Sequence, residues 1–331
     1  MTVLIVAVLI GASIGPAGPP WWQVPLELLN RLPLISFDSG VSDAEWNIVW
    51  RIRMPRVVLG GLVGGMLSIA GASYQGVFRN PLVDPYLLGA AAGAGLGATL
   101  ALTSGRSITT SLPIDLVPMA AFIVALLTVS VTYAVGASFG GRRSGVTLIL
   151  AGVAVVSFAT ALQTLILQRN LELVREVFQW ILGTLAGATW ADVRLVLPYV
   201  VVSCIVLMLH RRHLDVFRVG DVEAATLGVS VARTRLVIVI AATLGTAAVV
   251  SVSGLIGFVG LVVPHVVRLV AGAGYRRLLP LSLMFGAAFL ILADVVGRTI
   301  SSPAETPIGV VTALIGAPFF IYLLRTRKVT L

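Results

Sequence analysis

The chain of 331 residues is 58% hydrophobic, and only 11% of its residues are charged. So few charged groups could not cover the surface of a water-soluble fold of this length, which excludes a soluble globular protein. The formal net charge of +9 would suit a nucleic-acid-binding protein only if the basic residues formed one continuous surface. They are instead divided among short segments between apolar stretches, so nucleic acid is not an expected partner.

Ten apolar stretches of near membrane-spanning length follow one another along the chain. A helix needs about 20 apolar residues to cross the hydrocarbon core, and continuous stretches exclude the short alternating strands of a barrel. The predicted fold class is therefore all-α, a polytopic membrane protein with about ten transmembrane helices in one domain, 1–331. The predicted spans are 2–18, 56–77, 86–104, 114–136, 145–167, 191–209, 234–254, 256–272, 279–298 and 307–324, and several glycines within 254–272 leave open a broken span there.

The two sides of the predicted bundle differ in charge. With the N-terminus in the cytoplasm, the inner segments hold fourteen basic residues and four acids, whereas the outer segments hold nine of each. An excess of arginine and lysine on the cytoplasmic side is typical of membrane proteins, so both termini are predicted to be cytoplasmic. All six tryptophans fall near predicted outer ends of spans, where aromatic rings favour the membrane interface.

Small residues predict close helix packing in the second and third spans. Glycines recur there at every fourth position, in the series Gly60 and Gly64, Gly61 and Gly65, and Gly89, Gly93 and Gly97. Such spacing lets two helix backbones approach closely in a membrane. A lining that slides during transport is the alternative interpretation.

A faint internal repeat links two distant segments. Residues 68–71 and 251–254 each begin with serine and end with glycine, and each glycine is followed ten residues later by a proline, Pro81 or Pro264. The two spans run in opposite directions in the predicted topology. The pattern therefore indicates an inverted repeat, which is common among transporters.

The sequence contains no motif for ATP hydrolysis. A phosphate-binding loop ends in Gly-Lys-Ser or Gly-Lys-Thr, and the single lysine is Lys328. Cys204 stands alone, and the three histidines are not spaced as metal ligands. We therefore expect no catalytic residue, no metal site and no cofactor bound by this chain, which would not be an enzyme.

Ionisable residues within spans are expensive in lipid, and they either mark a transport pathway or pair with one another. Asp294 and Arg298 lie one helical turn apart in the ninth span, a spacing that predicts a structural ion pair. The alternative function is a proton- or sodium-driven secondary transporter with Asp294 as its coupling site.

One long polar segment, 211–235, interrupts the apolar stretches. Within it, Asp221 is predicted to cap a short helix after Gly220, the helix to cover Val222–Leu227, and Gly228 to end it. A short rigid helix between two spans suits docking into the groove of a partner protein. A connector lying along the membrane interface is the alternative.

Long motifs occur in a fixed order across nearly the whole chain. They are Arg53-Met54-Pro55-Arg56; Arg79-Asn80-Pro81-Leu82 with Asp84-Pro85 and Leu88-Gly89; Leu150-Ala151-Gly152-Val153-Ala154; Gly220-Asp221 with Leu227-Gly228; Gly257-Phe258-Val259-Gly260-Leu261 with Pro264-His265 and Arg268-Leu269; and Glu305-Thr306-Pro307-Ile308-Gly309 with Gly316-Ala317-Pro318-Phe319-Phe320. In these motifs the chain resembles the permease subunits of ABC importers for iron–siderophore complexes, haem and cobalamin, the FecCD-type or type II importer permeases.

The resemblance implies a homodimer in the cytoplasmic (inner) membrane of a prokaryote. Two cytoplasmic ATPase subunits would use ATP and Mg, and an external substrate-binding protein would deliver the substrate. That substrate would be a bulky metal chelate, with a ferric siderophore as the first choice and haem or cobalamin as alternatives. The segment 211–235 would be the cytoplasmic coupling segment.

The resemblance also implies roles for individual residues. Docking of the binding protein would involve Arg53, Arg56 and Arg298. Coupling to the ATPase would involve Gly220, Asp221, Glu223, Ala224, Leu227 and Gly228. An inner gate would be formed by Asn80 and Leu82 and a second one by Gly145 and Val146, a pair that departs from the small hydroxylated residues of some family members. The pathway would be lined by Val155, Ala159, Leu162 and Gln163.

Overall fold

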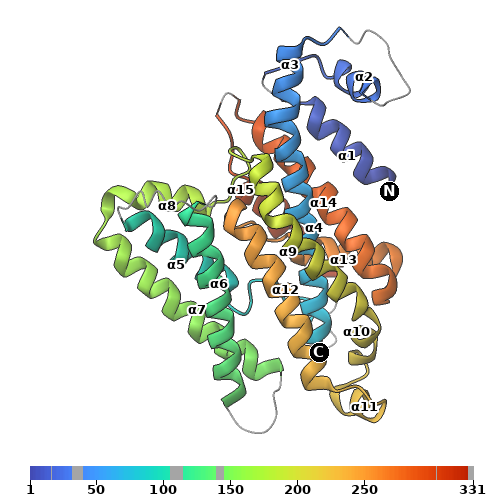
Figure 1. Ribbon diagram of the computed structural model, residues 1–331. Coiled ribbons are helices and arrows are strands. Elements are labelled where there is room, and N and C mark those ends of the chain that lie inside the picture. The colour runs from blue at the N-terminus through green and yellow to red at the C-terminus, as the bar shows by residue number, and fades with distance from the viewer. Residues whose placement is uncertain (16, 32–39, 105–114, 139–144, 303, 327–331) are drawn as a thin grey trace.

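Helices make up nearly all of the chain that the structure describes. The computed structural model describes residues 1–15, 17–31, 40–104, 115–138, 145–302 and 304–326, and no strand occurs among them (Figure 1). The elements are α1 (Thr2–Ser13), α2 (Gln23–Asn30), α3 (Asp43–Ile48), η1 (Val49–Arg53), α4 (Met54–Val77), α5 (Ala90–Thr103), α6 (Leu116–Ser138), α7 (Gly145–Gln168), η2 (Leu171–Leu173), α8 (Val174–Ile181), α9 (Trp190–Leu209), α10 (Arg211–Phe217), α11 (Asp221–Thr226), α12 (Val231–Ser253), α13 (Val259–Ala271), α14 (Tyr275–Thr299) and α15 (Ile308–Thr326).

Each of the ten predicted spans coincides with one helix, but the helices differ in length. Six segments are long and apolar enough to cross a membrane, namely Asp43–Val77, Leu116–Ser138, Thr147–Gln168, Trp190–Leu209, Val231–Ser253 and Tyr275–Thr299. The apolar helices Thr2–Ser13, Ala90–Thr103, Val259–Ala271 and Ile308–Leu323 are shorter. The all-α membrane fold is therefore confirmed, whereas the count of ten transmembrane helices stays a prediction.

The helices form two groups that meet at α12. In one group α5, α6 and α7 pack against one another, with α8 against α5; in the other, α4 contacts α9, α12, α13 and α14 (Figure 1). Because α12 contacts both α4 and α6, it joins the two groups. Figure 1 shows α3 at one end of the bundle and α11 at the opposite end, which we call the α3 end and the α11 end.

The predicted close packing of glycine-bearing spans is confirmed. A Cβ atom built on Gly64 would lie 2.2 Å from the carbonyl oxygen of Gly286 in α14, and one on Gly97 would lie 2.3 Å from that of Ala120 in α6. Real Cβ atoms essentially never come so close to another heavy atom. Glycine is therefore required at these positions because the neighbouring backbone occupies the space of a side chain.

The helix in the glycine-bearing stretch 254–272 is short, because α12 ends at Ser253 and α13 does not begin until Val259. The extended segment between them meets the connector between α4 and α5. Through its hydroxyl, Tyr86 of that connector donates to the carbonyl oxygen of Ile256 and accepts from its N–H, at 3.1 and 3.2 Å. Tyr86 and Ile256 lie after the two copies of the sequence repeat, residues 68–71 and 251–254. The chain segments that follow the two copies are thus hydrogen-bonded to each other.

Candidate functional site

A cluster of buried charges joins the first turn of α4 to the last part of α14. The guanidinium of Arg56 donates to the carboxylate of Asp294 at 2.9–3.0 Å and to that of Glu305 at 2.8 and 3.0 Å. Arg298 lies on the other side of Asp294, with Nε 3.6 Å from a carboxylate oxygen. The predicted ion pair of Asp294 and Arg298 is confirmed, but the closer partner of Asp294 is Arg56. Sequence reasoning missed that partner because it lies 238 residues away.

Arg53 and Arg298 bind the C-terminal end of α1. Arg53 donates to the carbonyl oxygens of Ala12 and Ser13 at 3.1 and 2.9 Å, and Arg298 donates to that of Gly11 at 2.6 Å. The last carbonyl groups of a helix have no partner within the helix and carry partial negative charge, so guanidinium groups stabilise this end. Both side chains are buried, with exposed fractions of 4% and 3%.

This burial counts against the docking prediction for two of the three arginines. Arg53 and Arg298 are occupied inside the chain and present no free guanidinium group to a binding protein. Arg56 remains as the candidate, because its side chain is 11% exposed and its partner Glu305 is 36% exposed. Glu305 thus occupies the position that a docking carboxylate would take.

A compact helical element, α10 followed by α11, lies at the α11 end. Gly220 (φ +128°) precedes α11 and Gly228 (φ +82°) follows it, and both use backbone conformations that favour glycine. The N–H groups of Gly228 and Val229 donate to the carbonyl oxygens of Ala225 and Ala224, which is the Schellman arrangement at a helix end. The predicted stop at Gly228 is therefore confirmed.

The start of this helix differs from the prediction by one residue. Gly220 is the residue that precedes the helix, and Asp221 is already helical. Instead of capping, the Asp221 carboxylate accepts two hydrogen bonds from Arg235 of α12 at 2.9 and 3.0 Å. This ion pair fixes α11 to the first turns of α12.

The exposed side of α11 and its C-cap carries two large apolar side chains. Ala224 is fully buried against the bundle, whereas Val222 and Leu227 are 74% and 67% exposed. Glu223 is also exposed. Large apolar side chains presented at the end of a bundle, beside charged residues, are typical of a surface that a partner covers.

The connector between α4 and α5 carries the predicted inner gate. Asn80 accepts from the N–H of Leu82 through its side-chain oxygen at 2.9 Å, which closes a local turn, and Leu82 is exposed. Gly145 and Val146 of the second predicted gate begin α7, and their side chains lie outside the described residues.

Asp84 of the same connector is partly buried, and burial raises its pKa to about 6 despite the hydrogen bond that it accepts from the N–H of Tyr86. The folded protein therefore binds a proton that the unfolded chain releases at lower pH, so this carboxyl costs stability as the pH rises from about 4 to above 6. An asparagine side chain cannot lose a proton, so the free energy of unfolding of Asp84→Asn should not fall in this way. Between pH 4 and pH 7 the variant should therefore gain about 1–3 kcal/mol of stability over the unsubstituted protein. Thermal unfolding in detergent across this range measures the difference, and parallel curves would contradict it.

The predicted pathway residues of α7 do not share one surface. Gln163 is buried and donates to the carbonyl oxygen of Gly95 and to the hydroxyl of Thr99 in α5, at 3.3 and 3.0 Å. Ala159 is buried as well, whereas Val155 and Leu162 are half-buried. The exposed side of α7 instead presents Leu150, Val153, Phe158 and Leu165. Gln163 therefore packs on α5, and the assignment of these four residues to a pathway stays a prediction.

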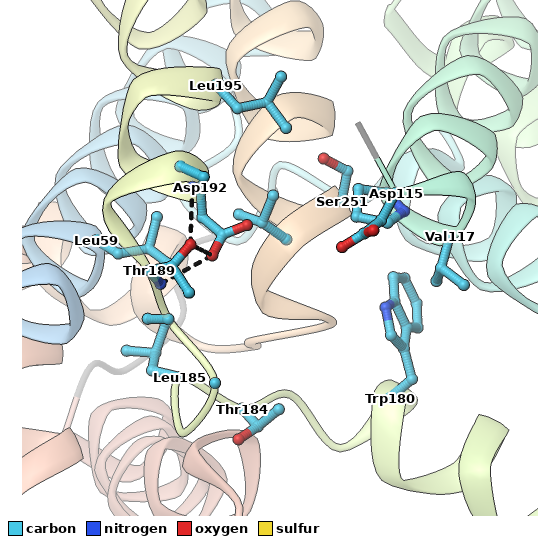
Figure 2. A pocket seen from close by; sticks show the side chains of 15 residues that line it. Leu59, Asp115, Val117, Trp180, Thr184, Leu185, Thr189, Asp192, Leu195 and Ser251 are labelled. Carbon is cyan, nitrogen blue, oxygen red and sulfur yellow. Dashed lines mark hydrogen bonds between the residues drawn. The ribbon is translucent and has the colours of Figure 1, made fainter. Parts of the chain in front are cut away.

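Figure 2 shows a cavity of about 360 Å³ near the α3 end, between α4, α6, α8, α9 and α12. Trp180, Asp115 and Ser251 face it. The Asp192 carboxylate accepts hydrogen bonds from the N–H and the hydroxyl of Thr189, as part of the capping box at the start of α9. Other cavities of the described chain measure about 210 to 460 Å³. Such volumes lie below or toward the lower end of the range for drug-sized ligands, about 300–1,000 Å³, so none of these cavities would hold a bulkier substrate.

In the part of the chain that the structure describes, no group of three histidine, cysteine, aspartate or glutamate residues is placed so that it could hold a metal ion. The arrangement therefore consists of a docking candidate at one end, a rigid apolar element at the other, and helices between them.

Comparison with known proteins matches this arrangement to one family. The FecCD transport family matches residues 3–326. The cobalamin import system permease protein BtuC of Halobacterium salinarum is 43% identical over 312 residues, which cover 94% of this chain and 81% of that protein. The hemin transport system permease protein HmuU of Yersinia pestis is 36% identical over 293 residues, which cover 88% and 87%.

A solved structure supports the same relationship. A metal-chelate type ABC transporter in an inward-facing conformation superimposes with a TM-score of 0.84 at 28% sequence identity, covering 98% of this chain and 97% of that one. The family match extends over nearly the whole length, and both of the relatives named above exceed 30% identity. The chain therefore belongs to the FecCD transport family and is a membrane permease of the ABC importer type.

Proposed function

We propose that this permease moves a bulky metal chelate, namely a ferric siderophore, haem or cobalamin, across the cytoplasmic membrane toward the cytoplasm. The observation that carries the proposal is the match to permeases named for cobalamin and for hemin, along 94% and 88% of the chain. Cavities of a few hundred Å³ within one chain favour a pathway between two copies, and the exposed apolar side of α7 is a candidate wall. The working unit is accordingly a homodimer.

Energy for this transport comes, in our proposal, from a separate ATPase. The chain contains one lysine, at position 328, and no phosphate-binding loop. Two ATPase subunits would dock at the α11 end, where the exposed side chains of Val222 and Leu227 would fill an apolar groove. The arginine excess in the segments at this end favours a cytoplasmic orientation for it and for both chain termini.

An external binding protein would dock at the α3 end. Arg56 is the arginine of the predicted docking set that reaches the surface, and a carboxylate of the binding protein would compete with Glu305 for it. Bidentate pairing between guanidinium and carboxylate provides the geometric specificity for such docking.

The alternative of a proton- or sodium-driven carrier loses its proposed coupling site. Asp294 is 4% exposed and is held between Arg56 and Arg298, so it cannot take up and release a cation without breaking two ion pairs. Its environment is that of a structural charge.

Uptake into proteoliposomes tests the proposal. The permease, reconstituted with its ATPase and binding protein, is expected to accumulate radiolabelled cobalamin, haemin or a ferric siderophore only when ATP is enclosed on the ATPase side. A proton or sodium gradient without ATP should produce no uptake. Accumulation driven by either gradient alone would refute the ATP-driven mechanism.

Leu227→Asp tests the coupling element. A buried carboxylate in an apolar groove is costly, so we expect the ATPase to co-purify with this variant at less than about a tenth of the unsubstituted yield. Leu171→Asp is the matched control, because Leu171 is similarly exposed, at 72%, but belongs to η2 outside the coupling element. Equal ATPase recovery with both variants, in a protein that elutes as folded, would exclude this docking surface.

A further inference from the structure

Three arginines from separate segments surround a cavity of about 240 Å³ at the α11 end. Arg79 follows α4, Arg218 follows α10, and Arg268 lies in the last turn of α13. Gln75 and Tyr275 complete the polar lining, and no carboxylate lines the cavity. We call it the three-arginine pocket.

Arg268 carries a hydrogen-bond donor that the described chain does not satisfy. Its Nη1 atom is shielded from solvent and has no acceptor among the described residues. A buried donor without a partner costs roughly 1–3 kcal/mol, more when the group is charged, so its presence indicates an acceptor supplied from outside the chain.

The nearby carboxylates neutralise the pocket only weakly. Asp221 lies 3.9 Å from Arg79 but accepts closer bonds, at 2.9 and 3.0 Å, from Arg235. Asp215 lies 3.9 Å from Arg218 and accepts a hydrogen bond from the N–H of Tyr275. The side chains of Arg79 and Arg218 are about half exposed, at 49% and 51%, and are therefore free to turn toward a ligand.

The backbone also holds one of the arginines in an uncommon conformation. Arg79 has φ +51°, one of two non-glycine residues with positive φ in the described chain. Arg79 is the residue after the C-cap of α4: the N–H groups of Arg79 and Asn80 donate to the carbonyl oxygens of Gly76 and Gln75, the Schellman arrangement that ends this helix and fixes where the Arg79 side chain leaves the backbone.

We propose that the three-arginine pocket binds a phosphate group. Phosphate presents several strong acceptor oxygens, and guanidinium groups match its geometry with paired hydrogen bonds. The unsatisfied Nη1 of Arg268 would donate to one oxygen, and Arg79 and Arg218 would approach from the open side. The phosphate belongs either to the headgroup of an anionic membrane lipid or to a soluble phosphate compound, and both share this chemistry. The proposal does not depend on the identity of the transported substrate.

A bound phosphate would have a structural consequence. Arg79 belongs to the connector that carries Asn80 and Leu82, whereas Arg218 belongs to the segment between α10 and α11. One ligand that binds both arginines would therefore hold the connector against the coupling segment.

Binding to the purified full-length permease in neutral detergent tests the proposal. The probes are inorganic phosphate, a short-chain phosphatidylglycerol and, as the uncharged-headgroup control, a short-chain phosphatidylcholine, each followed by calorimetry and thermal unfolding at constant ionic strength. We expect saturable binding of at least one phosphate probe and weaker binding, by about tenfold, to Arg268→Gln. Arg276→Gln is the matched control, because Arg276 is exposed in the first turn of α14 and does not line the pocket.

The outcomes separate the two sources. Binding of inorganic phosphate identifies a soluble phosphate site, whereas binding of phosphatidylglycerol without inorganic phosphate identifies a lipid headgroup site. Should Arg268→Gln fail to fold, Arg218→Gln at the half-exposed rim takes its place with the same expected loss. The proposal is overturned if no phosphate probe binds saturably, or if pocket and control variants bind alike.

Discussion

Replacing Asp294 by alanine is expected to lower the free energy of unfolding by about 3–5 kcal/mol, because removal of one partner leaves buried charges uncompensated. Asp294 is the carboxylate between Arg56 and Arg298, and all three side chains have little exposed surface. Unfolding of the detergent-solubilised protein, followed by tryptophan fluorescence as a denaturing detergent is added, measures the change.

The control removes the other carboxylate of the same cluster. Glu305 is 36% exposed, so water can solvate Arg56 where Glu305 is lost, and Glu305→Ala should cost about 1 kcal/mol or less. A loss for Asp294→Ala no greater than that for Glu305→Ala would show that the buried cluster does not stabilise the fold.

Gly71→Ala is expected to destabilise the protein by about 3 kcal/mol. A Cβ atom on Gly71 of α4 would lie 2.0 Å from the carbonyl oxygen of Gly260 in α13. The obstructing atoms belong to the backbone, so two helices must separate, and overpacking of this kind costs about 1–3 kcal/mol or more. The same unfolding measurement detects the loss.

Gly61→Ala in the same helix is the matched control. A Cβ atom there would lie 3.5 Å from the nearest atom of Ile291 and 3.9 Å from Ala287, which is ordinary van der Waals contact. Alanine restricts the unfolded chain more than glycine, so Gly61→Ala should be neutral or stabilise the protein by up to about 1 kcal/mol. Similar losses for both substitutions would mean that the α4–α13 crossing tolerates expansion.

The spans and the short helix α11 could be predicted because local sequence determines them. A continuous apolar stretch of about 20 residues leaves few alternatives to a helix in a membrane. The end of α11 at Gly228 follows from the positive φ that glycine adopts at low cost, within a few residues of the helix itself. The family could likewise be identified, since its motifs are short segments in a fixed order.

Side-chain partners far apart in the chain could not be predicted in this way. Arg53, Arg56 and Arg298 were all expected to meet a binding protein, yet tertiary packing buries Arg53 and Arg298 against α1 and pairs Arg56 with Asp294 across 238 residues. A charged residue near the end of a span has the same local pattern whether it faces a partner protein or its own chain. Only the packed structure distinguishes the two cases.

The sequence by itself therefore determined the helical membrane fold, the position of the short helix α11 and the family, because each depends on neighbouring residues. The tertiary structure decided which side of each helix is free. Since α7 is apolar on nearly every side, hydrophobicity could not show that Gln163 faces α5 and Phe158 the surface. The tertiary structure also brings Arg79, Arg218 and Arg268 to one cavity, because contacts between distant segments depend on how the helices pack.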